Sequence, residues 1–105
     1  DCHTASLFPD SPALTEQRRW VIPSVAPEPP QARLTLTVPA LCHAANTFFL
    51  VSGAGKSSAL RKVLAAAQPS LHCPASLIRP VNGQLIWWAD RAATALLPAS
   101  VRPPR

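Results

Sequence analysis

Two stretches of the chain show the hydrophobic patterns of β-strands. Between residues 33 and 39, the apolar side chains of Leu34, Leu36 and Val38 alternate with threonines, which is the period-two pattern of a strand with one buried face. Residues 48–51, Phe-Phe-Leu-Val, instead form a continuous apolar run. Such a run is typical of a strand covered on both faces, as in a parallel sheet flanked by helices. This second stretch predicts an α/β fold.

A helical pattern follows the second strand. Residues 57–67 are rich in alanine and leucine, with their larger apolar side chains on one helical face and Arg61 and Lys62 on the other. This spacing predicts an amphipathic helix that covers the sheet. Gly53 and Gly55 stand between strand and helix and allow the chain to reverse direction sharply. The whole segment therefore predicts a strand, a tight turn and a helix.

The turn before this helix is a candidate anion-binding site. A helix that begins beyond the carboxyl end of a strand directs unpaired backbone N–H groups into the crevice there, and Lys56 adds a positive charge. Phosphate is the expected occupant. A nucleotide-binding P-loop is not expected, because its spacing requires a glycine where this chain has Leu50, inside the predicted strand. An ordinary turn with a solvated lysine is the alternative.

The rest of the chain predicts shorter elements. They are a strand over 20–22, a helix over 40–45 opened by Pro39, a strand over 85–88, a helix over 91–97 capped by Asp90, and a disordered basic tail over 99–105. Trp87 and Trp88 in the last strand are interpreted as packing residues rather than as part of a ligand site.

Composition narrows the class of protein. The 105 residues carry ten Lys and Arg against five Asp and Glu, a net charge of +5 that favours anionic partners. The charges are scattered, however, so no nucleic-acid partner is expected. No apolar run approaches the roughly 20 residues that cross a bilayer, and no secretory leader opens the chain, so no membrane partner is expected. We expect one domain at most, with a cytoplasmic location.

The cysteines and histidines invite a test for metal binding. Cys2, Cys42 and Cys73 are an odd number, and each has a histidine neighbour. In a chain without a secretory leader, reduced thiols are expected rather than a disulfide framework. Adjacent Cys and His side chains diverge, and the spacings typical of zinc sites are absent, so no metal site is expected.

His3 and Asp1 are the candidate acid and base pair. Imidazole titrates near neutral pH, and a nearby carboxylate can select its tautomer and raise its basicity. The alternative is a loop histidine with no catalytic role.

Several motifs resemble one enzyme family. Residues 1–9, Asp-Cys-His-Thr-Ala-Ser-Leu-Phe-Pro, are similar to the Asp-Gly-His-Thr-Ala-Ser-Leu-Phe-Pro signature of the 6-phosphogluconolactonases, with Cys2 in the glycine position. If that position has a positive φ, the cysteine costs about 1 to 2 kcal/mol and displaces His3. Residues 33–39, 49–56 and 74–80 resemble further segments of the family, in the same order.

The resemblance implies a fold as well as a family. The implied fold is a Rossmann-like, three-layer α/β domain with a mostly parallel sheet, in the glucosamine-6-phosphate isomerase superfamily. Residues 1–98 would be the carboxyl-terminal part of such a domain. The chain does not begin with Met, which also suggests a partial or processed protein.

The resemblance also implies an activity. This is hydrolysis of 6-phospho-D-glucono-1,5-lactone to 6-phosphogluconate in the oxidative pentose phosphate pathway, with no metal or organic cofactor. It implies that His3 is the general base, oriented by Asp1, and that Arg33 and Lys56 hold the phosphate. The full-length form is expected to be a monomer. The alternative is a non-catalytic truncated fragment that at most binds a sugar phosphate, because the family's upstream glycine-rich loop is missing here.

Overall fold

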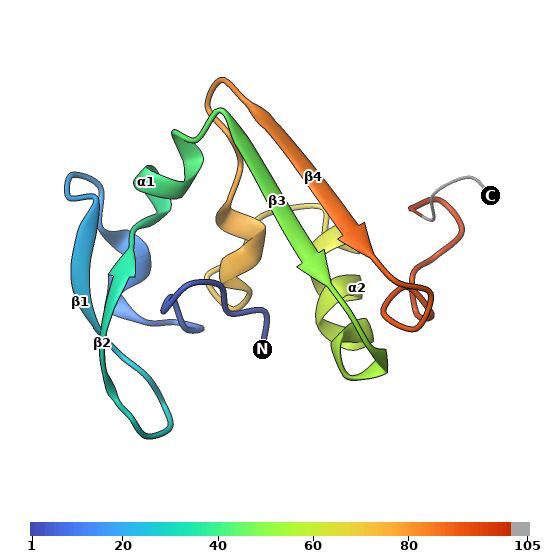
Figure 1. Ribbon diagram of the computed structural model, residues 1–105, viewed down its shortest axis with the longest axis horizontal. Helices are drawn as coiled ribbons and strands as arrows, with labels where there is room; N and C mark the ends of the chain where they lie inside the picture. Colours follow the sequence, from blue (N-terminus) through green and yellow to red (C-terminus); the bar gives the residue numbers. More distant parts are fainter. Residues whose placement is uncertain (102–105) are drawn as a thin grey trace.

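Four strands form two separate sheets in the computed structural model, which describes residues 1–101 (Figure 1). β1 (Val21–Val25) and β2 (Ala32–Leu36) pair antiparallel along their whole lengths. β3 (Asn46–Val51) and β4 (Gln84–Ala89) pair parallel, also end to end. The chain is therefore a small α/β unit with both kinds of strand pairing.

Two α-helices connect these strands. α1 (Val38–Cys42) follows β2, and the Thr37 hydroxyl caps it by accepting a hydrogen bond from Ala40 N at 3.3 Å. α2 (Ser57–Ala65) lies between β3 and β4 in the sequence and against one face of their sheet (Figure 1). The predicted strand, turn and helix are confirmed. Three short 3-10 helices complete the elements: η1 (Pro12–Thr15), η2 (Ala54–Lys56) and η3 (Pro74–Leu77).

The buried core is divided into three clusters. One lies beside the β1–β2 hairpin and includes Leu7 and Ile22. The other two lie between α2 and the β3–β4 sheet, where Leu60 is buried and Trp87 packs against both clusters. The amino-terminal segment is therefore anchored by Leu7 on one side and reaches the α2 side through Cys2.

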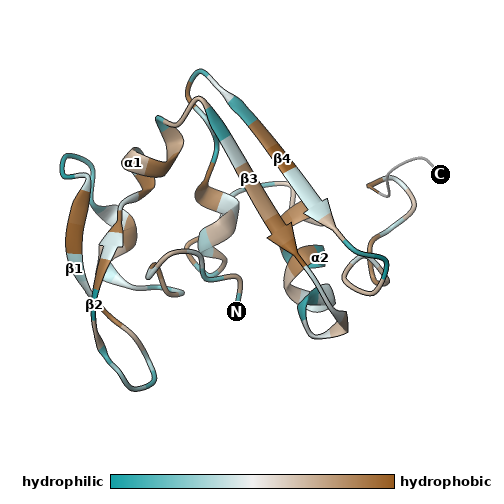
Figure 2. Ribbon diagram, viewed as in Figure 1, coloured by the Kyte–Doolittle hydropathy of each residue, from teal (hydrophilic) through white to brown (hydrophobic). Residues whose placement is uncertain are grey.

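The expectation that β3 is covered on both faces is wrong. Its exposure alternates, and the side chains of Phe48 and Leu50 are 55% and 76% exposed. The other face of the sheet is the covered one: Phe49 and Trp87 pack against a cluster that includes Cys2 and Cys73, and Val51 against one that includes Leu60 of α2. The hydrophobic segment formed by the second half of β3 is visible in Figure 2. A continuous apolar run predicts that both faces of a strand are covered. It does not say which part of a protein covers each face.

The helix expected over residues 91–97 is also absent, because this segment forms successive turns. The capping role expected of Asp90 is nevertheless present. Its Oδ1 accepts a hydrogen bond from Ala93 N at 2.8 Å. The cap thus stabilises a turn rather than a helix.

The expectation of reduced thiols is wrong for two of the three cysteines. Cys2 and Cys73 form a disulfide with their Cα atoms 4.9 Å apart, although 71 residues separate them in the sequence. Cys42 is free and buried. No local pattern could identify the pair, because the fold brings the two segments together.

Three further expectations concern the chain end and possible ligands. The predicted disordered tail over 99–105 lies in part outside the described residues, since the structure ends at Val101, whose N donates to Pro98 O at 3.0 Å. Among residues 1–101, no helix is long and apolar enough to span a bilayer. Within the same residues, no three His, Cys, Asp or Glu side chains gather as metal ligands would.

Candidate active site

A cavity of about 320 Å³ opens between the amino-terminal segment, α2 and the inner face of the β3–β4 sheet. This volume suits a small molecule. Its lining includes Asp1, His3, Phe49, Gly55, Lys56 and Trp87. Phe49 and Trp87 stack with their ring centroids 4.0 Å apart, so they form a flat apolar wall.

The His3 ring is oriented by its own segment. Its Nδ1 lies 3.0 Å from Asp1 Oδ1, and the His3 backbone N donates to the same oxygen at 3.1 Å. The ring also stacks on Phe8, at 5.1 Å between centroids. Because a carboxylate only accepts hydrogen bonds, Nδ1 carries the proton and Nε2 is left with its lone pair. His3 is therefore presented as a base.

The surroundings of His3 favour its neutral form. Burial lowers the pKa of His3 below its usual 6.5, and the positive charges of Lys56, the amino terminus and Arg33 lower it further. A base with a pKa below 6.5 is deprotonated at neutral pH. The residue is then ready to accept a proton at physiological pH.

Lys56 is positioned by the turn after β3. Gly53 has φ 92°, a left-handed conformation that glycine adopts without steric cost. Lys56 N donates to Gly53 O at 3.1 Å, and α2 begins at the next residue, Ser57. Gly55, the other glycine of the predicted turn, does not have a positive φ. The reversal therefore depends on Gly53, and it places Lys56 and the start of α2 at the cavity.

Asp90 holds this turn, a role that the sequence analysis missed. Its carboxylate accepts hydrogen bonds from Ser52 Oγ at 2.7 Å and from Gly53 N at 3.0 Å. The bonds from Ala93 N and Ser52 Oγ lower the pKa of Asp90, with Gly53 N adding to them. The sequence did contain a signal for this role, because Asp90 directly follows β4. Parallel neighbouring strands end at the same edge of the sheet, so a residue directly after β4 lies near the turn that follows β3.

Arg33 is placed differently from Lys56. It lies on β2, half-buried, and its Nε donates to Pro30 O at 2.6 Å. Arg33 does not line the cavity, but its charge acts on His3. The structure thus brings Asp1, His3 and Lys56 to one cavity and leaves Arg33 near it.

Cys2, which stands where the family signature has a glycine, has the positive φ that glycine favours. Its φ is 60°, a left-handed value that costs a residue with a Cβ roughly 1 to 2 kcal/mol. Its backbone O accepts a hydrogen bond from Ala75 N at 2.9 Å. The residue before His3 is therefore held in an unfavourable conformation by contacts with residues 73–75.

A nucleotide-binding loop is not supported by this geometry. Leu50 lies inside β3, and the chain runs as a strand until Val51. The turn that follows is too short to wrap around successive phosphates.

Comparison with known proteins gives a consistent family match. The family described as glucosamine-6-phosphate isomerases/6-phosphogluconolactonase matches residues 1–87. A 6-phosphogluconolactonase from Homo sapiens is 44% identical over 98 residues, which cover 92% of this chain and 38% of that protein. One from Synechocystis is 43% identical over 93 residues, covering 89% of this chain and 38% of that protein.

Solved structures agree with this match. The structure titled devB protein has a TM-score of 0.80 and 31% identity, and the alignment covers 90% of this chain and 40% of that one. A 6-phosphogluconolactonase from Leishmania guyanensis has a TM-score of 0.76 and 32% identity, with 94% and 39% covered. This chain spans about 38% of the length of the curated relatives it matches.

Proposed function

Because this chain belongs to the family of glucosamine-6-phosphate isomerases and 6-phosphogluconolactonases, we propose that it supplies the base and a phosphate-binding lysine for hydrolysis of 6-phospho-D-glucono-1,5-lactone. The curated relatives named above are 6-phosphogluconolactonases. The observation that carries the proposal is that His3 and Lys56 line the same cavity. A base and a cation in one cavity suit an ester that carries a phosphate.

His3 performs the proton transfers. Its Nε2 removes a proton from a water molecule, and the resulting hydroxide attacks the lactone carbonyl carbon. The ring C–O bond then breaks, and the imidazolium returns its proton to the departing alkoxide. The Asp1 carboxylate keeps the proton on Nδ1 and stabilises the imidazolium. General base catalysis of this kind contributes about 10²- to 10⁴-fold to the rate.

The phosphate end of the substrate orients the reacting end. Lys56, directly before α2, provides a positive charge for the phosphate oxygens. Arg33 contributes positive charge from β2. Binding energy gained at this remote group holds the carbonyl carbon next to the water that His3 activates.

A second candidate function is binding without catalysis. The chain spans about 38% of the length of its curated relatives, so a site assembled from the whole length of such a protein would be incomplete. In that case the chain would bind a sugar phosphate through Lys56 and hydrolyse nothing.

The first experiment measures lactone hydrolysis by the chain, alone and mixed with the segment of the human relative that it does not match. His3→Gln should lower the rate by about 10²-fold or more, to the level of spontaneous hydrolysis. His72→Gln is the matched control, because His72 is also paired with an aspartate, Asp10, at 2.7 Å but does not line the cavity. Equal rates for the two variants would remove His3 from the mechanism.

The second experiment measures binding of 6-phosphogluconate by calorimetry. Lys56→Gln should weaken binding by about ten-fold, since it removes one charge-assisted hydrogen bond. Lys62→Gln, on α2 but outside the cavity, should leave the affinity unchanged. Binding that depends on Lys56 without any hydrolysis in either assay would favour the second candidate function.

A further inference from the structure

The contacts that orient the His3 ring do not fix its position relative to Lys56. Asp1 and Phe8, which hold the ring, belong to the same amino-terminal segment, and Leu7 anchors that segment beside the β1–β2 hairpin rather than at α2. A movement of this segment would carry all three side chains together. Some other contact must therefore hold His3 at the cavity.

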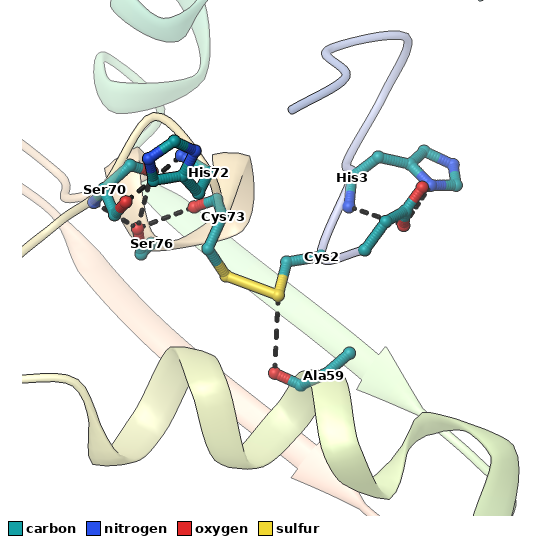
Figure 3. Close-up of a disulfide and its surroundings, with 8 residues drawn as sticks. Cys2, His3, Ala59, Ser70, His72, Cys73 and Ser76 are labelled. Carbon is teal, nitrogen blue, oxygen red and sulfur yellow. Dashed lines mark hydrogen bonds and ion pairs between the residues drawn. A yellow bond between two sulfur atoms is a disulfide. The ribbon is translucent and has the colours of Figure 1, made fainter. Parts of the chain in front are cut away.

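The Cys2–Cys73 disulfide is the covalent link next to His3. Figure 3 shows it joining the residue before His3 to the segment that begins η3, with the His3 side chain directed away from the bond. Ala75 N donates to Cys2 O at 2.9 Å in the same place. The segment that carries His3 is thus fastened to residues 73–75.

The disulfide also adjoins the helix that begins after Lys56. Cys2 Sγ lies 3.6 Å from Ala59 O (Figure 3), and Cys2, Cys73 and Ala75 form a buried cluster against which Ala59 and Val63 of α2 pack. Ala59 follows Lys56 by three residues. The disulfide therefore lies between the backbone that carries His3 and the first turns of α2, and packs against those turns.

The backbone conformation of Cys2 indicates what the Cys2–Cys73 disulfide does. Cys2 has φ 60°, a conformation that glycine adopts freely but that a residue with a Cβ leaves unless its surroundings hold it. A return of Cys2 to negative φ would redirect the chain at the next residue, which is His3. The bond opposes this change.

We propose that Cys73, through its disulfide to Cys2, is a positioning residue for His3, and that it holds the imidazole at the cavity that Lys56 also lines by keeping Cys2 in the left-handed conformation. This inference rests on the proposed role of His3, but its test needs no substrate. Failure of the lactonase proposal would therefore be distinguishable from failure of this one.

The proposal makes the position of His3 sensitive to reduction by a dithiol. One thiolate of the reductant attacks a sulfur of the pair and forms a mixed disulfide, and its second thiol then displaces the remaining protein sulfur. Two electrons and two protons pass to Cys2 and Cys73, and the reductant becomes a disulfide.

The bond itself is tested by alkylation of the denatured full chain, followed by mass spectrometry. One cysteine, Cys42, should react before treatment with dithiothreitol, and all three should react after it. Three reactive thiols in the untreated protein would overturn the proposal.

Positioning is tested by NMR titration of the His3 ring, with its signal assigned from a His3→Gln spectrum. The charged groups that act on the ring are Asp1, Lys56, Arg33 and the amino terminus. With the bond intact, Lys56→Gln should raise the pKa of His3, because it removes a positive charge. After reduction, or in Cys73→Ser, the same substitution should leave that pKa unchanged, because the two side chains no longer line the same cavity.

A rescue variant separates positioning from general stabilisation. The double variant Cys2→Gly, Cys73→Ser lacks the bond but allows positive φ at position 2, so the response of His3 to Lys56→Gln should return. Cys42→Ser is the matched control and should retain the response throughout.

Three outcomes would overturn the proposal. One is an unchanged response to Lys56→Gln in Cys73→Ser and in the reduced protein. Another is a double variant that behaves like Cys73→Ser. The third is loss of the folded NMR spectrum in every form without the bond, since the disulfide would then be a requirement of the fold rather than a positioning device.

Discussion

At the scale of single residues, backbone conformation decides which side chain a position accepts. Three non-glycine residues of the amino-terminal segment, Cys2, Ala5 and Asp10, have positive φ. This segment is therefore held by its contacts rather than by local preference. Gly83 illustrates the opposite case, in which space rather than φ excludes a side chain. A Cβ on Gly83 would lie 2.5 Å from Ala44 O.

Gly83→Ala should therefore lower the free energy of unfolding by about 1 to 3 kcal/mol, the usual cost of forcing extra atoms into a packed site. The backbone carbonyls of Ala44 and Ala45 would have to move. Gly55→Ala is the matched control, because its Cβ would have no neighbour within 4 Å, and it should change stability by less than about 0.5 kcal/mol. Urea denaturation measures both. Equal stabilities of Gly83→Ala and Gly55→Ala would contradict the close packing of Gly83 against the backbone of Ala44 and Ala45.

At the scale of elements, the Asp90 side chain links the carboxyl end of β4 to the turn that follows β3. Asp90, the residue after β4, accepts hydrogen bonds from Ser52 and Gly53, which follow β3. The turn that leads to Lys56 is thus fastened to the neighbouring strand. The position of Lys56 depends on strand pairing and not only on the glycine of its own turn.

Asp90→Asn should lower the midpoint of thermal unfolding at pH 7, because an amide offers fewer acceptor sites than a carboxylate. The hydrogen bonds from Ala93 N, Ser52 Oγ and Gly53 N lower the pKa of Asp90 below 3.8. The stabilisation is therefore complete above pH 3.8 and is lost as the pH falls through the lowered value. The difference between Asp90→Asn and wild type should shrink accordingly in calorimetric scans at falling pH.

Glu28→Gln is the control for this prediction. It removes the same charge from an exposed position in the connection between β1 and β2. It should change the midpoint of thermal unfolding little, both at pH 7 and at lower pH. A difference between wild type and Asp90→Asn that stays constant down to pH 2 would contradict the assigned hydrogen bonds.

At the scale of the whole molecule, apolar side chains cover the outer face of each sheet. Phe48, Leu50 and Trp88 are exposed on β3 and β4, and Val25 and Leu34 on β1 and β2. Faces of this kind bind other apolar surfaces.

The double variant Leu50→Lys, Trp88→Lys should reduce the binding of an apolar dye such as ANS to the folded chain, and it should reduce concentration-dependent self-association in sedimentation. Both substituted positions lie on the exposed face and are paired across the sheet. Gln84→Lys, at the exposed start of β4, adds a positive charge without removing apolar area. If Gln84→Lys had the same effect as the double variant, charge rather than apolar area would be responsible.

Much of the fold and part of the candidate site could be predicted from the sequence. The strand at β2, the run that forms β3, the amphipathic α2 and the capping residue Asp90 were all visible, because each depends on neighbours within about ten residues. The Asp1–His3 pair was visible for the same reason. The catalytic and phosphate-binding roles of these residues remain predictions.

The rest depended on contacts between distant parts of the chain. Only the tertiary structure decided that Cys2 pairs with Cys73, that Arg33 lies outside the cavity that holds Lys56, and that one face of β3 is open. The physical reason is range: propensity, periodicity and turn chemistry act along the chain, whereas a disulfide, a cavity wall and a covered face are fixed by how separate elements pack together. The sequence by itself determined which elements form and which residues could do chemistry, and packing determined which of those residues meet.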